Sequence, residues 1–409
     1  MSRIRLVASC LMLTCGIAAG QTASLSLLGD LPGGEFSSTA LAVSADGTIV
    51  VGYSNTAIGL EAFRWTAATG MVGLGDFAGG LENSRCEAIS ADGSMIVGHG
   101  HGPVDFQAAM WNANGPIQSI GLLPGGTSSV ALGVSDDGKI IVGKGSSSWS
   151  NDEAYRWTAS TGYQPLGGFA SSFPSSNAFA ISGDGSRIVG YSYGPTGFEA
   201  CYWDEQGVIH GIGQFGGVLN PASEARATNV DGTIVVGASM DNNGETAFRW
   251  TAATGLQALP TAGNVRFKKA LAVSDDGRVI AGGSHSLSGT WYAIIWTEAS
   301  GTRVLGEVME NFYGLDLQGF SPVEAHGLSE DGRTVVGWGL GSNGEEAFIA
   351  YLPPCYADCN DSLTLDIFDY ICFGNSYNGT ESYADCDNSG TWNIFDYICF
   401  GNAYANGCH

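Results

Sequence analysis

Two neighbouring stretches decide the fold of this chain: ALAVSADGTIVVGY at residues 40–53 and EAFRWTAATGMVGLG at residues 61–75. Each stretch places two short apolar runs on either side of a turn. The first turn contains Asp46-Gly47, and this pair favours a tight hairpin because glycine tolerates positive φ. The second turn spans Thr66–Gly70. We therefore predict that one copy of the pattern forms four short strands.

The pattern recurs along residues 40–351. Its Asp-Gly pair appears at Asp46-Gly47, Asp92-Gly93, Asp137-Gly138, Asp184-Gly185, Asp231-Gly232, Asp276-Gly277 and Asp331-Gly332. Six tryptophans follow at spacings of 46 or 47 residues: Trp65, Trp111, Trp157, Trp203, Trp250 and Trp296. Such a period is typical of propeller blades, which take about 40 to 50 residues. The sequence predicts an all-β fold, a seven-bladed β-propeller built from seven repeats of about 46 residues.

Small residues recur at two places in every repeat. A glycine ends the second predicted strand at Gly52, Gly98, Gly143, Gly190, Gly237, Gly282 and Gly337. An alanine recurs at Ala62, Ala108, Ala154, Ala200, Ala247, Ala293 and Ala347. Small side chains let neighbouring sheets approach closely, so we interpret both sets as packing positions.

The residue after each recurring glycine varies. These residues are Tyr53, His99, Lys144, Tyr191, Ala238, Gly283 and Trp338. Aromatic rings gathered on one face could stack on sugar rings. Ordinary variation in loops and at strand ends explains the set equally simply, and we favour that interpretation.

The last repeat is incomplete. After Ala347–Tyr351 the chain reaches Pro353-Pro354 without a fourth strand. The segment Leu25–Leu28 lies one 46-residue period ahead of Met71–Leu74, so it can supply the missing strand. Closure of a ring by the N-terminal segment would leave no open sheet edge. An open solenoid is the alternative, although it would not need this permuted arrangement.

These repeats resemble the HAF family of extracellular repeats over most of residues 25–351. The family is named after a His-Ala-Phe core before an apolar strand. The histidine is replaced here by Glu61, Gln107, Glu153, Glu199, Thr246, Tyr292 and Glu346. The resemblance implies a secreted repeat protein and little about activity.

A tandem duplication occupies the C-terminal part: YADCNDSLTLDIFDYICFGNSYN is followed 27 residues later by YADCDNSGTWNIFDYICFGNAYA. Each copy opens with a 12-residue loop whose oxygen-bearing side chains stand at positions 1, 3, 5, 9 and 12, as in an EF-hand Ca²⁺ loop. The predicted ligands of the first loop are Asp358, Asn360, Ser362, Asp366, Asp369 and the carbonyl of Thr364. Those of the second are Asp385, Asp387, Ser389, Asn393, Asp396 and the carbonyl of Thr391. An acidic, disulfide-held tail without metal is the alternative.

The two loops differ at the sharp-turn position. The second loop has Gly390 there, whereas the first has Leu363, for which positive φ is costly. Each loop is predicted to lead into a short helix, Ile367–Phe373 or Ile394–Phe400. We expect the helices to stop at Gly374-Asn375 and Gly401-Asn402.

One loop and one helix, repeated twice, resemble a dockerin over residues 355–408. The chain departs from that family in the serine at position 5, in Leu363 and in its six cysteines. Dockerins dock onto a cohesin domain. The resemblance therefore implies attachment to a cohesin-like protein or to a cell-surface scaffold.

Six of the ten cysteines lie in the last 55 residues, and they are expected to form a disulfide framework. Cys355 and Cys408 bracket the module and are expected to clasp its ends. Cys359 and Cys372 recur as Cys386 and Cys399, and their connectivity stays open among fifteen possibilities. Cys86 and Cys201 lie in repeats that would not be neighbours in a ring, so we expect them to be buried free thiols.

The N-terminus has the features of an export signal. Arg3 and Arg5 precede the apolar run Leu6–Ile17, which is too short to span a bilayer. We expect a signal peptide at 1–20, a propeller at 21–352 and the dockerin-like module at 353–409, in a secreted protein that is extracellular or at the cell surface. The net charge of −24 disfavours nucleic acid and insertion into anionic membranes, and it suits divalent cations.

No motif identifies a catalytic site. The six histidines share no metal-ligand spacing, and no nucleophile elbow or phosphate loop is present. The leading hypothesis is a non-enzymatic binding protein whose propeller presents loops to a ligand such as a carbohydrate, with Ca²⁺-dependent attachment through the tail. The alternative is a polysaccharide-degrading enzyme, a glycoside hydrolase or a polysaccharide lyase, because dockerins often accompany catalytic domains.

Overall fold

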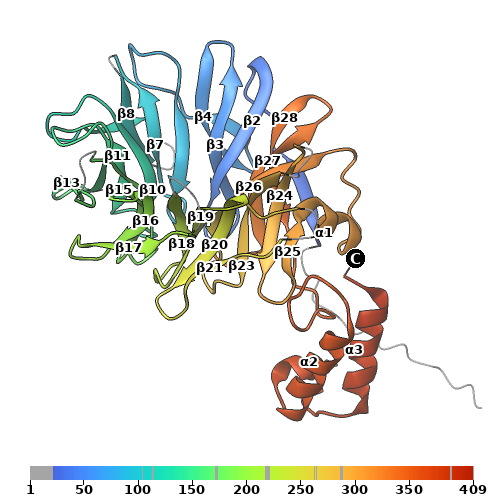
Figure 1. The fold of residues 1–409 in the computed structure, drawn as a ribbon. Coiled ribbons are helices and arrows are strands. Elements are labelled where there is room, and N and C mark those ends of the chain that lie inside the picture. Colours follow the sequence, from blue (N-terminus) through green and yellow to red (C-terminus); the bar gives the residue numbers. More distant parts are fainter. Residues whose placement is uncertain are drawn as a thin grey trace, which may run out of the picture.

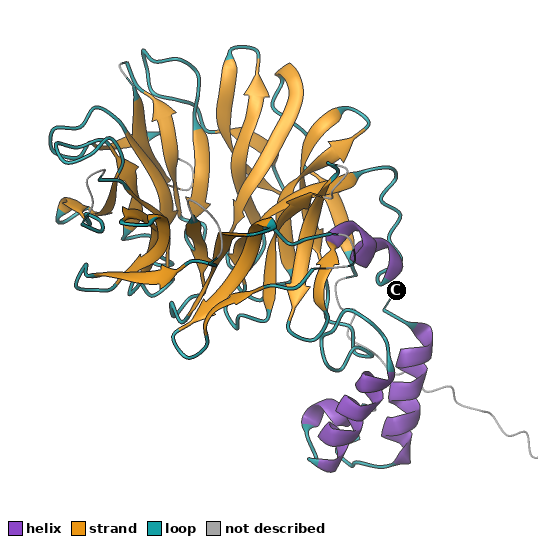
Figure 2. Ribbon diagram, in the orientation of Figure 1, coloured by secondary structure: helices purple, strands orange, loops and turns teal. Residues whose placement is uncertain are grey.

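A computed structural model describes residues 22–103, 105–112, 115–170, 174–216, 222–261, 263, 265–285, 289–386 and 389–408. The expected signal peptide lies outside these residues. A β-body carries a small helical module at its C-terminal end (Figures 1 and 2). Within the described part of the chain, no helix is long and apolar enough to cross a membrane.

Four antiparallel four-stranded sheets follow one another in the middle of the body. The first contains β6 (Arg85–Ile89), β7 (Met95–His101), β8 (Phe106–Asn112) and β9 (Gln118–Gly121). The second contains β10 (Ser129–Val134), β11 (Ile141–Gly145), β12 (Glu153–Thr158) and β13 (Gly162–Pro165). The third contains β14 (Ser176–Ile181), β15 (Ile188–Gly194), β16 (Gly197–Trp203) and β17 (Ile209–Gly213). The fourth contains β18 (Ser223–Thr228), β19 (Ile234–Asp241), β20 (Gly244–Thr251) and β21 (Gly255–Ala258).

Three further groups of four strands are joined into one 12-stranded sheet. One group is β2 (Gly33–Val43), β3 (Ile49–Thr56), β4 (Gly59–Thr66) and β5 (Gly70–Gly73). Another is β22 (Lys269–Val273), β23 (Val279–His285), β24 (Trp291–Thr297) and β25 (Gly301–Val304). The last is β26 (Ser321–Leu328), β27 (Thr334–Gly341), β28 (Gly344–Tyr351) and β1 (Ser24–Leu27). Single residue pairs, Gly283 with Glu324 and Ser37 with Glu345, connect these groups.

The N-terminal strand completes the last group as expected. β1 runs antiparallel to β28, with Leu25 opposite Ala350 and Leu27 opposite Phe348. The prediction that the N-terminal segment supplies the missing strand is therefore confirmed.

The first strands of the groups follow one another around a central axis. β2 contacts β6, β6 contacts β10, and the series continues through β14, β18 and β22 to β26, which contacts β2 again. Backbone hydrogen bonds also link the turns of neighbouring groups. Ala45 N donates to Ala91 O at 3.1 Å, and Glu330 N donates to Ala45 O at 3.3 Å, so the first and last groups are joined.

Each Asp-Gly turn is held by its own side chains. In the first group, Asp46 Oδ1 accepts hydrogen bonds from Thr48 N at 3.0 Å and from Ser44 Oγ at 2.7 Å. Gly47 has a φ of 74°, which only glycine adopts without strain. The serine two residues before the aspartate belongs to this turn, and we had not singled it out from the sequence.

The recurring glycines are packing positions, as predicted. A Cβ added to Gly52 would lie 2.0 Å from Thr39 O, so the neighbouring strand leaves no room for a side chain. Trp111 and Trp203 are fully buried, and their indole N–H groups donate to Leu74 O and Leu166 O. These two contacts tie the sheets of Trp111 and Trp203 to the group that precedes each of them.

The helices differ from the prediction. The helices α2 (Ile367–Asn378) and α3 (Ile394–Asn406) continue through the glycines at which we expected them to stop. A Cβ on Gly374 would lie 3.5 Å from the Tyr397 hydroxyl, so this glycine sits where the helices pack together. A short helix, α1 (Leu305–Asn311), and the 3-10 turn η1 (Ser382–Ala384) were not predicted.

Candidate functional site

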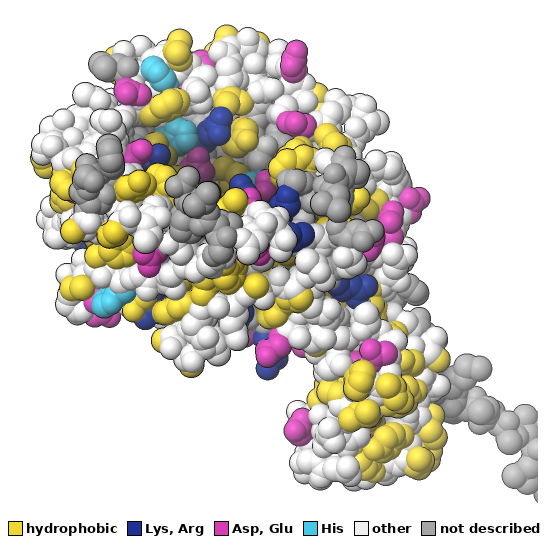
Figure 3. Space-filling view, viewed as in Figure 1, with side chains coloured by type: hydrophobic (Ala, Val, Ile, Leu, Met, Phe, Trp, Pro, Cys, Tyr) yellow, Lys and Arg dark blue, Asp and Glu magenta, His cyan; other side chains and the backbone are white. Residues whose placement is uncertain are grey.

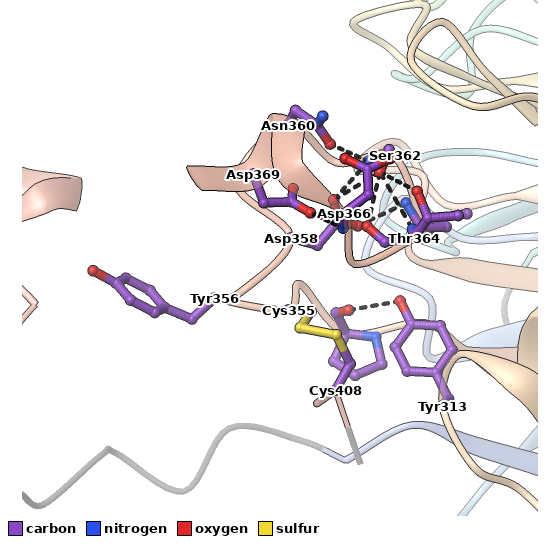
Figure 4. The surroundings of a disulfide bond; sticks show 12 residues. Tyr313, Cys355, Tyr356, Asp358, Asn360, Ser362, Thr364, Asp366, Asp369 and Cys408 are labelled. Atoms are coloured by element: carbon purple, nitrogen blue, oxygen red, sulfur yellow. Dashed lines mark hydrogen bonds between the residues drawn. A yellow bond between two sulfur atoms is a disulfide. The ribbon is translucent and has the colours of Figure 1, made fainter. Parts of the chain in front are cut away.

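The first predicted Ca²⁺ loop curls around the carboxylate of Asp358 (Figure 4). Asp358 Oδ1 accepts a hydrogen bond from Ser362 N and Asp358 Oδ2 accepts one from Leu363 N, both at 2.7 Å. Asn360 Oδ1 also accepts from Ser362 N, at 3.0 Å. Ser362 Oγ lies 3.0 Å from Thr364 O. The side chains at positions 1, 3 and 5 and the carbonyl at position 7 are thus gathered in one small region.

Asp369 reaches the same region from the first turn of α2. It is fully buried, and its Oδ2 accepts a hydrogen bond from Asp366 N at 2.8 Å. Its Oδ1 is also buried but has no hydrogen-bond partner among the described residues. A buried carboxylate oxygen without a donor is costly, and a cation would satisfy it.

Two carboxylates converge in this loop. Burial raises the pKa of Asp358 to about 6, and the Asp369 carboxylate adds to the rise. Burial likewise raises the pKa of Asp369. Asp366 is differently placed, because its side chain caps α2 by accepting from Phe368 N at 2.8 Å. In EF-hand loops position 9 often acts through a water molecule, so this placement remains compatible with a hard cation.

The second loop has the same local structure where it is described. Asp385 accepts hydrogen bonds from Ser389 N at 2.9 Å and from Gly390 N at 2.8 Å. Ser389 Oγ lies 3.2 Å from Thr391 O. Asn393 caps α3, and the buried Asp396 accepts from Asn393 N at 2.7 Å. The predicted ligand Asp387 lies outside the described residues.

A site built only from histidine, cysteine and carboxylate ligands is not found. Among the described residues, no three such side chains are grouped so that they could hold a metal ion. The two loops instead combine two converging acidic residues with amide, hydroxyl and carbonyl oxygens. This mixture of oxygen donors suits Ca²⁺ rather than a transition metal.

The first loop has Leu363 where glycine is usual at the sharp turn, and the packing of this side chain explains the difference. Its φ is 57°, the strained region predicted from the sequence, and it is 7% exposed. Its side chain belongs to a cluster with Leu305, Val308 and Phe348 of the β-body. Arg303 Nη1 donates to Leu363 O, and Arg333 Nη2 lies 3.3 Å from Asp361 Oδ1. The loop therefore anchors the module to the body.

The disulfides fit this arrangement. Cys355 pairs with Cys408, so the expected clasp is confirmed, and both residues pack against the cluster that contains Leu363. Cys359 pairs with Cys372 and Cys386 with Cys399, each within its own copy. The remaining pair of described cysteines, Cys86 and Cys201, are buried and free, as predicted.

An exposed apolar surface on α2 and α3 was not singled out from the sequence. It consists of Ile367, Phe368, Ile371, Ile394, Phe395 and Ile398, and we call it the Ile-Phe surface. Each of these side chains is between 52% and 64% exposed. Figure 3 shows hydrophobic side chains gathered over the module. The signal was present in the sequence, because IFDYI occurs in both copies.

The variable residues after the recurring glycines lie within strands rather than in loops. Tyr53 pairs with Thr39 in the first group, His99 with Arg85 in the second, and Lys144 with Val130 in the third. The other four have equivalent places, Tyr191 opposite Asn177, Ala238 opposite Glu224, Gly283 opposite Lys269 and Trp338 opposite Glu324. They therefore stand beside the first strands that surround the axis.

Comparison with known proteins shows the fold alone. No family model matches the chain. No curated protein matches it either. Among solved structures it is similar to an oligogalacturonate lyase from Vibrio parahaemolyticus, with 12% identity, coverage of 82% of this chain and 99% of that chain, and a TM-score of 0.50. TolB from Acinetobacter baumannii matches with 14% identity, coverage of 76% and 81%, and a TM-score of 0.42. An oligogalacturonate lyase in complex with manganese matches with 11% identity, coverage of 82% and 98%, and a TM-score of 0.46. The chain thus has a mostly β fold like that of propeller proteins.

Proposed function

We propose that this chain is a secreted binding protein in which a seven-bladed propeller is attached, through a Ca²⁺-dependent dockerin-like module, to a protein at a cell surface or on a scaffold. Seven groups of four strands arranged around one axis support the propeller. The three disulfides suit an oxidising, extracellular environment.

The loops support Ca²⁺ as the cofactor. Both copies wrap backbone N–H groups around the carboxylate at position 1 and bury the aspartate at position 12. When bound, Ca²⁺ would supply charge neutralisation for these paired carboxylates. In the first loop Asp358 and Asp369 would hold it, with Asn360, Ser362 and the Thr364 carbonyl as neutral oxygen donors.

The Ile-Phe surface supports attachment to a protein, and it is the observation that carries this proposal. Six large apolar side chains on two adjacent helices are exposed in the same pattern in both copies. Helices of a protein that binds no partner usually bury such side chains in its own core. An exposed apolar patch of this kind marks an interaction site. A cohesin-like domain is the partner class that the module's sequence implies.

A binding experiment tests the attachment. The full chain is titrated against a panel of recombinant cohesin-like domains by surface plasmon resonance, in Ca²⁺ and in EDTA. Binding is expected in Ca²⁺ only. The variant Ile367→Ser/Ile371→Ser/Ile394→Ser/Ile398→Ser should abolish it without loss of Ca²⁺ affinity. Replacing exposed Val72 and Val208 of the body with serine is the matched control, since both are also exposed apolar side chains. Ca²⁺-independent binding, or equal binding by the surface variant, would contradict the proposal.

A polysaccharide-degrading enzyme is the second candidate, and one cluster favours it. Burial raises the pKa of Glu87 to about 7, although the neighbouring Arg85 opposes the rise. His99 Nδ1 lies 3.5 Å from Glu87 Oε1, and burial lowers the pKa of His99 to about 4. A carboxyl group that titrates near neutral pH is suited to general acid or base catalysis. The oligogalacturonate lyase from Vibrio parahaemolyticus has a similar fold. Incubation with a glycan panel separates the candidates: new reducing or unsaturated ends indicate an enzyme, and binding without cleavage indicates a binding protein.

A further inference from the structure

The first strands of the seven groups share a bulge that places one extra residue beside the axis. In each first strand the register shifts after an alanine or cysteine, for example between Cys86 and Ala88, and the residue in between is the bulged one. The bulged residue is leucine in three groups. In the other four it is Glu87, Phe179, Arg226 or His326. Repeat packing does not require these four residues, because leucine serves in the remaining groups.

These exceptions belong to a belt of side chains that crosses from one group to the next. The guanidinium of Arg85 lies 4.4 Å from the ring centre of Tyr53 in the preceding group. Likewise, the guanidinium of Arg226 lies 4.0 Å from the ring centre of Phe179 in the preceding group. Phe179 in turn packs 5.6 Å from Tyr191. Figure 3 shows a hollow in the middle of this face of the body, with Lys or Arg, His and acidic side chains inside it.

Basic residues are scarce in this protein, which has 16 lysines and arginines against 40 acidic residues. Four of them, Arg85, Lys144, Arg226 and Lys269, nevertheless stand on the first two strands of their groups. Lys144 is paired with Asp152 at 2.9 Å and Lys269 lies 3.8 Å from Glu245, whereas Arg226 contacts Glu224. Arg85 forms no ion pair among the described residues.

Several polar atoms in the belt are buried without a hydrogen-bond partner. They are Arg85 Nε, His99 Nδ1, Asn177 Oδ1 and Arg226 Nε, four of the nine such atoms in the described part of the chain. An unsatisfied buried donor or acceptor destabilises the fold, so such atoms call for a ligand or another explanation. Arg64 and Arg249 also have an unpaired Nε, but they occupy one recurring repeat position, in the motif FRWT. Arg85 and Arg226 do not recur.

We propose that this belt in the mouth of the central axis binds an oligosaccharide that carries carboxylate groups, such as a chain of uronic acids. Guanidinium groups hold carboxylates through paired hydrogen bonds. The exposed faces of aromatic side chains, including Phe198 at 40% exposure beside Tyr191, suit pyranose rings. Asn177 and His99 supply groups for ring hydroxyls. The assignment deepens the proposed function by naming the ligand class of the propeller, and it does not depend on Ca²⁺ binding by the tail.

Isothermal titration calorimetry on the full chain in EDTA tests this assignment, with hexamers of galacturonate and of mannuronate as probes. EDTA removes metal bridges between the tail and the acidic sugars. At least one acid is expected to bind, and its methyl ester, which has the same rings without the charge, should bind at least about tenfold more weakly. Arg85→Gln and Arg226→Gln should each weaken binding of the acid by a similar factor.

Lys139→Gln is the matched control because it removes one positive charge from a side chain that is 77% exposed on an Asp-Gly turn. It should leave the affinity unchanged. If Arg85→Gln fails to fold in a thermal melt, Arg85→Lys keeps the charge but loses the planar fork and should still weaken binding. Absence of binding by both acids at millimolar concentration would overturn the assignment. So would equal binding of acid and ester, or an equal loss in Lys139→Gln.

Discussion

Leu363 is the residue through which the first predicted Ca²⁺ loop packs against the body, and its replacement is expected to give an unusual order of effects. Leu363→Ala removes most of the buried side chain but keeps a Cβ at a φ of 57°. Leu363→Gly removes the side chain as well, yet it frees the backbone from the left-handed strain. We therefore predict that the alanine variant is less stable than the glycine variant.

The magnitudes follow from burial and strain. Truncation of a buried leucine to alanine typically costs about 2 to 5 kcal/mol, and Leu363 is 7% exposed within the shared cluster. The left-handed conformation costs a residue with a Cβ roughly 1 to 2 kcal/mol. Glycine recovers that amount and loses about 0.5 to 1 kcal/mol through its greater freedom in the unfolded chain. The glycine variant should thus be more stable than the alanine variant, by up to about 1.5 kcal/mol.

Differential scanning calorimetry of the full chain at fixed Ca²⁺ measures this order, and small-angle X-ray scattering shows whether the module detaches. Gly390→Ala is the matched control, because Gly390 occupies the same loop position at a φ of 73° with no atom within 4 Å of an added Cβ. It should show the strain cost without any change in shape. A glycine variant less stable than the alanine variant would refute the backbone strain at Leu363, and two variants as stable as the parent chain would refute its anchoring role.

Three further changes test other parts of the structure. Deletion of β1 should leave the edge of β28 open and promote aggregation, seen by light scattering, and a deletion mutant that stays monomeric would contradict closure by this strand. Glu87→Gln should flatten the pH dependence of the melting temperature: the raised pKa of Glu87 stabilises the fold below about pH 4.5, and this contribution is lost as the pH rises through about 7. An unchanged pH profile would count against a raised pKa of Glu87. Cys355→Ser with Cys408→Ser opens a loop of 53 residues and should cost ~4 kcal/mol, and a loss below 1 kcal/mol in calorimetry would show that the clasp is dispensable.

The repetitive features of the fold were predictable because they depend on local chemistry. The Asp-Gly turns, the recurring glycines and the missing fourth strand each specify a backbone conformation or a pairing partner within one repeat. The backbone of the two twelve-residue loops was predictable for the same reason, since the side chains that hold each loop lie within it. The Cys355–Cys408 pair followed from its position at the two ends of the module.

Other features depend on contacts that the sequence does not contain. Gly374 looks like a helix stop until the packing of Tyr397 against it is known. From the sequence, Leu363 is only a residue that disfavours the sharp turn of the loop. Its role is clear once its side chain is seen to pack against the β-body. From the sequence, Arg85 and Arg226 look like ordinary variation between repeats. They lie about 140 positions apart, and only the arrangement of the strands places both around one axis.

Calcium binding by the tail tests the account most directly. Isothermal titration calorimetry with the full chain is expected to show two sites that Asp369→Ala and Asp396→Ala remove one at a time, since both aspartates are buried at position 12 of their loops. Asp361→Ala is the control, because its carboxylate is 51% exposed at a position that provides no ligand, and both sites should remain. An absence of binding at millimolar Ca²⁺, or a loss in Asp361→Ala equal to that in Asp369→Ala, would contradict a Ca²⁺-dependent module.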